Sequence, residues 1–262
     1  PFSHRILIGA DHDVFDNYQQ FGRRRPPALS TNPSDAASYV IDIFDPVYGR
    51  FVPPTPLPNN DRLDRQTSTG VFVQDQIELT DRLQIRLGAR YDDFTLRTEN
   101  YITGINSERK DNRVSPQFGV VYEVADPVTL YAAYSEGFRA NIGTDVTGRI
   151  FDPESSRSIE AGAKLVLLNG ALTGTFTVYQ LDKDNVLASD INNPGFSVAI
   201  GEARSRGVEL DMNGRLPGGV DLLLSYAYVD ATSRSRVLDP NFSFVIEPGD
   251  PLINIPDHSF NA

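Results

Sequence analysis

The sequence predicts an all-β fold: an antiparallel, up-and-down transmembrane β-barrel, of which the chain holds about ten strands. Three observations predict it. First, apolar and polar side chains alternate with a period of two in about nine stretches, which is typical of strands whose two faces meet different solvents. Second, these stretches form four hairpins with turns of about two to four residues. Third, every connection at the opposite end spans about fifteen residues or more, and outer-membrane barrels have this asymmetry.

Composition and charge narrow the class of protein. With 40% hydrophobic and 23% charged residues, the chain is not disordered by composition. It has no run of about 18 apolar residues, which excludes a transmembrane helix, whereas a barrel strand needs only about 9–11 residues. The net charge of -11 argues against nucleic acid as a partner. The absence of cysteine excludes a disulfide framework and a cysteine metal site.

The chain opens with a strand and a long insertion. Residues 4–14 are expected to form a strand, and the polar, proline-rich residues 15–66 an external loop on a rigid scaffold. Residues 71–79 are the next strand, with Val71, Val73, Ile77 and Leu79 on one face. Asp75 falls on that same apolar face, and a β-bulge that shifts the phase would account for it.

The next strand has the most regular alternation in the chain. It covers residues 83–92, after a short turn at residues 80–82. Leu83, Ile85 and Leu87 point one way, and the intervening residues, including Arg86 and Arg90, point the other. In a soluble sheet the apolar face would meet a core, whereas in a barrel it meets lipid and the polar face lines a wet lumen. A loop is expected at residues 97–112.

A hairpin at the centre of the chain repeats the pattern. Residues 114–124 and 128–135 alternate in the same way, and Asp126-Pro127 breaks the pattern between them, because proline fixes φ and lacks a backbone donor. Beyond the second strand, residues 137–156 are predicted to form a long loop. The hairpin therefore has its tight turn at one end and a long loop at the other.

Two more hairpins follow with the same design. Asn169-Gly170, a strong hairpin signal, joins strands at residues 157–168 and 171–182. After a predicted loop at residues 183–202, Pro217-Gly218-Gly219 joins strands at residues 204–214 and 220–228. A final loop is expected at residues 232–255, and residues 256–262 are expected to start another strand.

Tyrosines support a membrane position. Tyr91, Tyr134, Tyr226 and Tyr228 lie on the apolar faces, six or eight residues after the first apolar residue of strands that leave the short turns. A shared height predicts an aromatic girdle at one membrane interface. Tyr179 is an exception, because it falls among the polar residues of its strand.

Several of these stretches resemble one family, the TonB-dependent outer-membrane receptors, and in particular its siderophore-receptor branch. The resemblance covers the chain from about Gly70 to the end, and six motifs occur in the order of the family. Asp45-Pro46-Val47-Tyr48-Gly49 is similar to a loop motif of the same branch. The matching stretches are residues 70–83 with 87–92, 114–122 with 130–139, 153–164, 184–186, 201–211 and 254–258.

The resemblance implies a monomeric barrel of about 22 strands with a plugged lumen, in the lipid of the outer membrane of a Gram-negative bacterium. It implies transport rather than catalysis: uptake of a ferric siderophore, driven by the inner-membrane TonB complex. This chain departs from the family pattern because the plug, the TonB box, and the early and closing strands are not in it. Residues 1–262 are therefore expected to be the middle portion of one barrel domain.

No catalytic motif is visible, and no cofactor or resident metal is predicted. His4, His12 and His258 lack the spacing of a metalloprotease site. Two acidic groups, Asp11 with Asp13 and Asp16, and Asp182 with Asp184, are more typical of solvated loops than of a cation site. The inward residues Glu160, Lys164 and Glu209 are expected to form a polar lumen wall.

Ligand capture is the remaining candidate function. A ferric siderophore is bulky and often anionic, which suits guanidinium groups and aromatic faces. Inward candidates near the upper rim are Arg90, Ser135 and Arg139, and loop candidates are Tyr48, Phe51 and Arg149.

Two alternatives stay open on the sequence. In the first, the same barrel carries a different cargo: haem, a cobalamin or an oligosaccharide. A soluble all-β binding module, such as a lectin-like sandwich, is the other alternative. A sandwich buries Leu83, Ile85 and Leu87 against a second sheet, whereas a barrel places them on the outer surface of one curved sheet.

Overall fold

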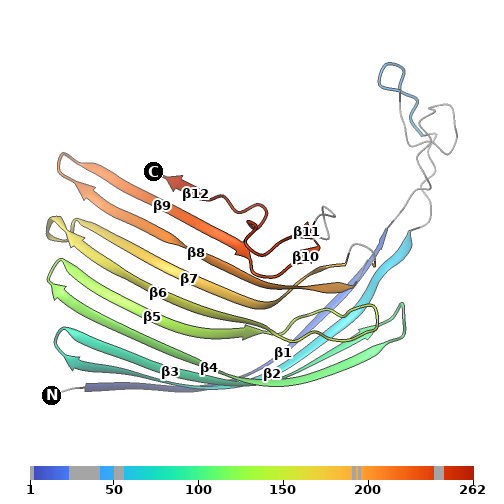
Figure 1. Cartoon of the computed structure of the whole chain (residues 1–262), viewed down its shortest axis with the longest axis horizontal. Helices are drawn as coiled ribbons and strands as arrows, with labels where there is room; N and C mark the ends of the chain where they lie inside the picture. The colour runs from blue at the N-terminus through green and yellow to red at the C-terminus, as the bar shows by residue number, and fades with distance from the viewer. Residues whose placement is uncertain (1–2, 24–41, 50–55, 191–192, 194–195, 239–244) are drawn as a thin grey trace.

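A single antiparallel sheet dominates the structure, which is a computed structural model describing residues 3–23, 42–49, 56–190, 193, 196–238 and 245–262. Ten strands follow one another in chain order, so the predicted nine strands and a final stub are confirmed (Figure 1). The strands are β1 Ser3–Arg23, β2 Leu57–Thr80, β3 Leu83–Asn100, β4 Asn106–Ala125, β5 Val128–Arg139, β6 Glu154–Leu167, β7 Leu172–Ser189, β8 Ser197–Leu216, β9 Val220–Ser233 and β12 His258–Asn261.

The remaining regular structure is small. A two-residue hairpin, β10 (Val237–Leu238) and β11 (Val245–Ile246), lies in the last long loop. One 3-10 turn, η1 (Leu168–Gly170), joins β6 to β7. Within the described part of the chain, no helix is long and apolar enough to cross a membrane.

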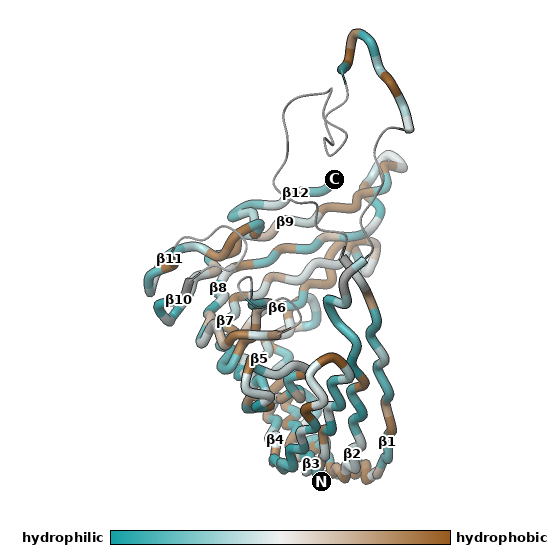
Figure 2. The backbone as a smooth tube through the Cα atoms, turned by 90° about the vertical axis from the view of Figure 1, so that its right-hand side faces the viewer, coloured by the Kyte–Doolittle hydropathy of each residue, from teal (hydrophilic) through white to brown (hydrophobic). Residues whose placement is uncertain are grey.

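The sheet curves into an open arc with two different faces (Figure 2). The strand register aligns the apolar rows: Leu87 lies opposite Phe118, and Phe118 opposite Tyr134. These rows lie on the convex face, and 45% of Leu87 and 44% of Phe118 is exposed. No second sheet covers them in the described residues, which contradicts the soluble sandwich. Tyr226 and Tyr228 share the apolar rows of their neighbours, as predicted.

Local chemistry explains the short turns. The Thr80 hydroxyl accepts hydrogen bonds from the backbone N–H groups of Arg82 (3.2 Å) and Leu83 (3.0 Å), which closes the turn between β2 and β3. In η1, Asn169 has a φ of 54° and Gly170 a φ of 90°, the left-handed region that these two residue types tolerate best. The hairpin predicted at Asn169-Gly170 is therefore confirmed.

Three predicted loops were too long. Residues 15–66, 97–112 and 183–202 were expected to be loops, but β1 continues to Arg23, β2 begins at Leu57, and β3 and β4 leave only residues 101–105 between them. Between β7 and β8 only residues 190–196 lie outside the strands. For residues 15–66 and 97–112 the physical reason is cross-strand charge pairing on the convex face, which leaves no apolar row for periodicity to detect. Arg65 pairs with Asp16 at 2.7 Å, and Arg97 with Glu108 at 2.6 Å.

Asp75 does not sit at a bulge, so that hypothesis was wrong. The register runs without interruption from Ile6 through Asp75 to Leu87; the irregularities lie elsewhere, after Glu78 in the pairing with β3 and after Phe21 in the pairing with β1. The Asp75 carboxylate therefore lies on the convex apolar face, where its Oδ2 atom is 2.7 Å from Nδ1 of His4. Pairing with a neighbouring imidazole accounts for an acid among apolar rows.

Gly162 offers a test of packing on the concave face. A Cβ atom there would lie 2.3 Å from the carbonyl oxygen of Phe176 and 2.7 Å from the ring of Tyr131. We expect Gly162→Ala to destabilise the complete barrel by about 1–3 kcal/mol, because strand and ring must move apart. The measurement is the urea midpoint of the receptor refolded in detergent.

Gly88 is the matched control, because it also faces inward but its nearest heavy atom would be 3.5 Å from an added Cβ. Gly88→Ala should leave the midpoint unchanged or raise it, since alanine restricts the unfolded chain. Equal losses in the two variants would contradict the packing described for Tyr131.

Candidate ligand-binding site

The connection between β5 and β6 folds back into the concave side of the sheet (Figure 2). This segment, residues 140–153, is called the inner loop below. Its Ala140 and Ile150 pack on Phe94 and Leu96 of β3, whose side chains are 2% and 1% exposed. The rings of Phe94 and Phe138 are 5.5 Å apart. The inner loop therefore has a small hydrophobic core of its own, which fixes its position.

Polar contacts fasten the inner loop at both sides of the arc. Towards β4, the Ser107 hydroxyl donates to the carbonyl of Gly148, and Arg109 pairs with Asp152 at 2.8 Å. Towards β8, the backbone N–H of Ser197 donates to the carbonyl of Thr144 at 2.9 Å. The inner loop thus bridges strands on either side of β5 and β6.

Two asparagines join the ends of the inner loop to β7. The Asn141 side-chain amide donates to the carbonyls of Asp152 (2.6 Å) and Asn185 (2.7 Å). The Asn185 amide in turn donates to the carbonyl of Pro153 at 3.1 Å. Asn185 has a φ of 58° at a register shift that follows Lys183. Two stretches that carried the family resemblance, residues 153–164 and 184–186, therefore meet in space, and their local sequence does not predict this.

Arg149 is held near the tip of the inner loop. Its backbone N–H donates to Asp145 Oδ1 at 3.0 Å, and its Nε atom to Asp145 Oδ2 at 3.2 Å. Its guanidinium lies 5.6 Å from the centre of the Phe151 ring, yet 72% of the side chain is exposed. The hydrogen bond from the Thr147 hydroxyl is the main cause that lowers the pKa of Asp145, against the opposing effect of burial. The loop therefore presents a preoriented cation to solvent.

A hollow of about 400 Å³ lies beside the inner loop on the concave face. It is called the loop-side hollow. Two predicted ligand residues, Arg90 and Arg139, line it together with Phe94 and Phe138. The Arg90 guanidinium is already engaged, because it makes two bonds to Asp11 (2.7 and 2.8 Å) and further bonds to Asp92. Arg139 is 73% exposed and makes one ion pair, to Glu154 at 3.0 Å.

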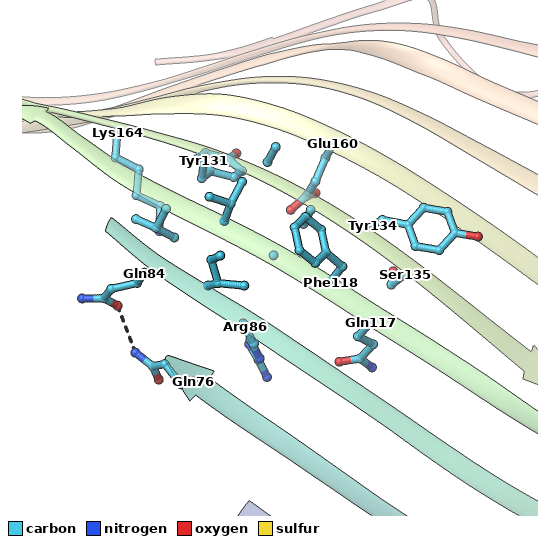
Figure 3. Close-up of a pocket in the computed structure, with 16 residues that line it drawn as sticks. Gln76, Gln84, Arg86, Gln117, Phe118, Tyr131, Tyr134, Ser135, Glu160 and Lys164 are labelled. Carbon is cyan, nitrogen blue, oxygen red and sulfur yellow. Dashed lines mark hydrogen bonds between the residues drawn. The ribbon is translucent and has the colours of Figure 1, made fainter. Parts of the chain in front are cut away.

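A second hollow, of about 450 Å³, lies nearer the short turns and is called the turn-side hollow (Figure 3). Ser135, the third inward candidate, lines this hollow and not the first. The predicted polar wall is present here, since Glu160 and Lys164 face the hollow beside Tyr131. Lys164 Nζ lies 5.5 Å from the centre of the Tyr131 ring.

The remaining candidates are scattered. Tyr48 is 81% exposed in the segment 42–49, and Phe51 lies outside the described residues. Each of the two acidic groups has members that pair with arginine: Asp11 with Arg90, Asp16 with Arg65, and Asp182 with Arg204 at 2.5 Å. Within the described residues, no group of three or more potential ligands gathers for a metal ion.

The three histidines all lie on strands. His4 pairs with Asp75, and His12 lies 2.8 Å from the Thr69 hydroxyl. His258, on β12, packs against the rings of Tyr226 and Tyr228. These contacts place the histidines in the strand framework and away from both hollows.

Comparison with known proteins identifies a single family. Residues 2–262 match the family model described as TonB dependent receptor-like, beta-barrel. A metal-pseudopaline receptor of Pseudomonas aeruginosa is 36% identical over 98% of this chain and 35% of its own length. The ferrichrome outer membrane transporter/phage receptor of Escherichia coli is 32% identical over 87% of this chain and 30% of its own.

Solved structures agree on the fold. The siderophore receptor of Acinetobacter baumannii superimposes with a TM-score of 0.74 at 19% identity, over 99% of this chain and 40% of the receptor. The chain therefore spans about a third of the length of the curated relatives it matches.

Removal of the Asn141 amide tests how the inner loop is held. Asn141→Ala leaves the carbonyls of Asp152 and Asn185 without their donor, which costs about 1–3 kcal/mol. We expect trypsin to cleave after Arg149 about 5- to 100-fold faster in the folded receptor, with the site identified by mass spectrometry. Asn112→Ala, at an exposed position on β4, should leave the rate unchanged.

Equal cleavage rates in Asn141→Ala and wild type would mean that the hydrophobic core of the loop suffices to hold it.

Acidification tests the role of Asp145. Because its pKa is lowered in the folded state, its ionised form stabilises the loop above the ordinary carboxyl pKa, and this stability is lost as the pH falls through the lowered value. We expect hydrogen exchange at the amides of Thr147 and Arg149, corrected for the intrinsic rate, to lose several-fold protection between pH 6 and pH 3.

Asp145→Asn keeps an acceptor but does not titrate in this range, so its protection should not depend on pH. The amide of Leu96 on β3 serves as the internal reference for global opening. A loss of protection that is the same in wild type and variant would contradict the assignment to Asp145.

Proposed function

Because the chain belongs to the TonB-dependent receptor family, we propose that the complete protein takes up a metal chelate across the outer membrane of a Gram-negative bacterium. The cargo is a ferric siderophore or a closely related metallophore. The energy comes from the inner-membrane TonB complex. Members of this family are transporters and not enzymes, and the chain contributes part of the barrel wall and the inner loop.

The names of the relatives support a chelate as cargo. The proteins at 36% and 32% identity are receptors for metal-pseudopaline and for ferrichrome. The name of the first relative specifies a chelate of an unspecified metal, and the name of the second specifies a chelate of iron. The relatives therefore support a metal chelate as the class of cargo more firmly than they support iron as the metal. Haem, cobalamin and oligosaccharide remain alternatives that a cargo assay separates.

One observation about the geometry carries the proposal: an ordered loop inside the arc holds an exposed cation, and the hollow beside that loop is lined by a second one. Arg149 lies over the Phe151 ring in the inner loop, and Arg139 lines the loop-side hollow together with Phe138. Guanidinium groups and aromatic faces suit a bulky, anionic chelate. Because the inner loop is already packed, binding does not have to order it.

The six candidate residues differ in how they would contribute. Arg139 and Arg149 are exposed and are proposed to contact cargo directly. Arg90 is proposed to shape the hollow, because its guanidinium is shared between Asp11 and Asp92. Ser135 would act in the turn-side hollow. Tyr48 and Phe51 would act from the connection between β1 and β2.

The partners of the complete protein follow from the same proposal. The chain would form a middle portion of one monomeric barrel, with a plug in its lumen and outer-membrane lipid against its convex face. The TonB complex would act through parts of the protein that this chain does not contain. Long stretches of the apolar face, from Ile6 on β1 to Phe260 on β12, are exposed and would meet hydrocarbon.

A transport assay tests the proposal. Deletion of the gene should abolish growth under iron limitation on at least one chelate of a panel that includes ferrichrome, ferric citrate and metal-pseudopaline, and the cloned gene should restore it. Growth that depends on haem or cobalamin alone, or no growth defect on any member of the panel, would contradict uptake of a siderophore-type chelate.

A substitution in the inner loop tests the role of this surface. Arg149→Ala should lower the initial uptake rate of the cargo about tenfold, because a preoriented charge-assisted contact is lost. Arg206→Ala is the matched control: it removes an arginine that is 64% exposed and paired with Asp230, but on the convex face. Equal effects of the two substitutions would argue against the inner loop as the cargo surface.

A further inference from the structure

We infer that Arg139, Glu154 and Lys183 form an anion-binding subsite that takes a carboxylate group of the chelate; the identity of the cargo rests on the proposed function. The three residues come from the end of β5, the start of β6 and the upper part of β7. Of the three, only Arg139 is a candidate from its place in the sequence. The juxtaposition of the three side chains is visible only in the fold.

One carboxylate lies between two cations. Glu154 Oε2 accepts a hydrogen bond from Arg139 Nη2, and its Oε1 accepts one from Lys183 Nζ, both at 3.0 Å. The Glu154 side chain is 10% exposed, whereas Arg139 is 73% and Lys183 41% exposed. The anion is therefore covered, both cations are partly exposed, and each has donors besides the one that Glu154 accepts. The group carries one surplus positive charge.

Neighbouring acids are held by other partners within the described residues. Asp152 pairs with Arg109 (2.8 Å), which it shares with Asp111, and Asp92 pairs with Arg90 (2.7 Å), which it shares with Asp11. Glu136 pairs with Arg113 (3.5 Å) and Asp182 with Arg204 (2.5 Å), and Asp184 accepts a hydrogen bond from the Ser155 hydroxyl (3.3 Å). In a protein with a net charge of -11, a covered glutamate with two exposed cations is a specific local arrangement. An anionic ligand group would complete it.

The surrounding backbone holds the group in place. Glu154 directly follows Pro153, whose carbonyl accepts from the amide of Asn185. Lys183 precedes the register shift at Asn185, and Asn141 donates to the Asn185 carbonyl. Because these hydrogen bonds fix the start of β6 against β7, the two cations are preorganised and little side-chain ordering is left for binding.

The chemistry selects the ligand group. A guanidinium matches the two oxygens of a carboxylate in a planar, bidentate fork, and an ammonium adds a second charge from the side. Arg139 also borders the loop-side hollow next to Phe138, so the apolar part of a chelate has a surface beside its carboxylate. A neutral hydroxamate chelate has no group that uses this subsite.

Titration calorimetry tests the subsite directly. It measures the binding of metal-free citrate to the complete receptor in detergent. We expect Arg139→Gln and Lys183→Gln each to weaken citrate binding about tenfold, and Arg139→Lys, which keeps the charge but loses the fork, by about threefold. Raising the salt concentration should weaken binding to the wild type more than to either glutamine variant.

Arg157→Gln is the matched control. Arg157 is 56% exposed and lies on β6, the strand of Glu154, but its side chain points to the convex face. It should bind citrate within about twofold of wild type. Ferrichrome, a neutral chelate, should show no difference between wild type and any variant. Heat-dependent migration on gels shows whether each variant is folded. If Arg139→Gln does not fold, citrate binding to Lys183→Gln and Arg139→Lys decides whether the subsite exists.

The inference is overturned if citrate fails to bind wild type, if both glutamine variants bind it like wild type, or if they lose ferrichrome by the same factor as citrate. These results differ from a failure of the proposed function. Citrate binding that depends on Arg139 and Lys183, in a receptor that supports growth on no metal chelate, would support the subsite and count against chelate uptake.

Discussion

The structure depends on one constraint: in hydrocarbon, every backbone N–H and C=O must find its partner within the protein. Consecutive antiparallel strands meet that constraint, because each strand pairs with the one before it and the one after it. Here the ten strands of the main sheet follow chain order without a crossover. Once the backbone is satisfied in this way, the side chains are free to serve two solvents, lipid on the convex face and water on the concave face.

The same constraint explains what happens beyond the membrane. Above the apolar rows the strands do not stop, because pairing still satisfies the backbone where water is present. Charge pairs such as Arg97 with Glu108 replace apolar contacts between neighbouring strands. The resulting wall extends past the tyrosines of the apolar rows, and its concave side supplies the surface on which the inner loop packs. Phe94 and Leu96, which cover that surface, are among the most buried side chains described.

Some residues of the candidate site can be selected from the sequence, but the way they are brought together cannot. Arg139 and Arg149 could be selected because one lies at the inward end of a predicted strand and the other in a predicted long loop. Glu154, Lys183 and the two asparagines could not, because nothing in their local sequence records that residues 141, 154 and 185 meet. Arg90 shows the opposite limit: its position on the inward face was predicted, but its bonds to Asp11, 79 residues away, leave it little capacity for a ligand.

By itself, the sequence determined the strand number, the alternation of faces, the positions of the four tight turns and the family of the protein. These are local properties. They follow from the two-residue period of apolar and polar side chains and from the turn preferences of proline, asparagine and glycine. Only the tertiary structure decided how far the strands extend, that residues 140–153 fold inward, and that Glu154 lies between Arg139 and Lys183. Those outcomes depend on pairing and packing between residues that are distant along the chain, for which no periodicity exists.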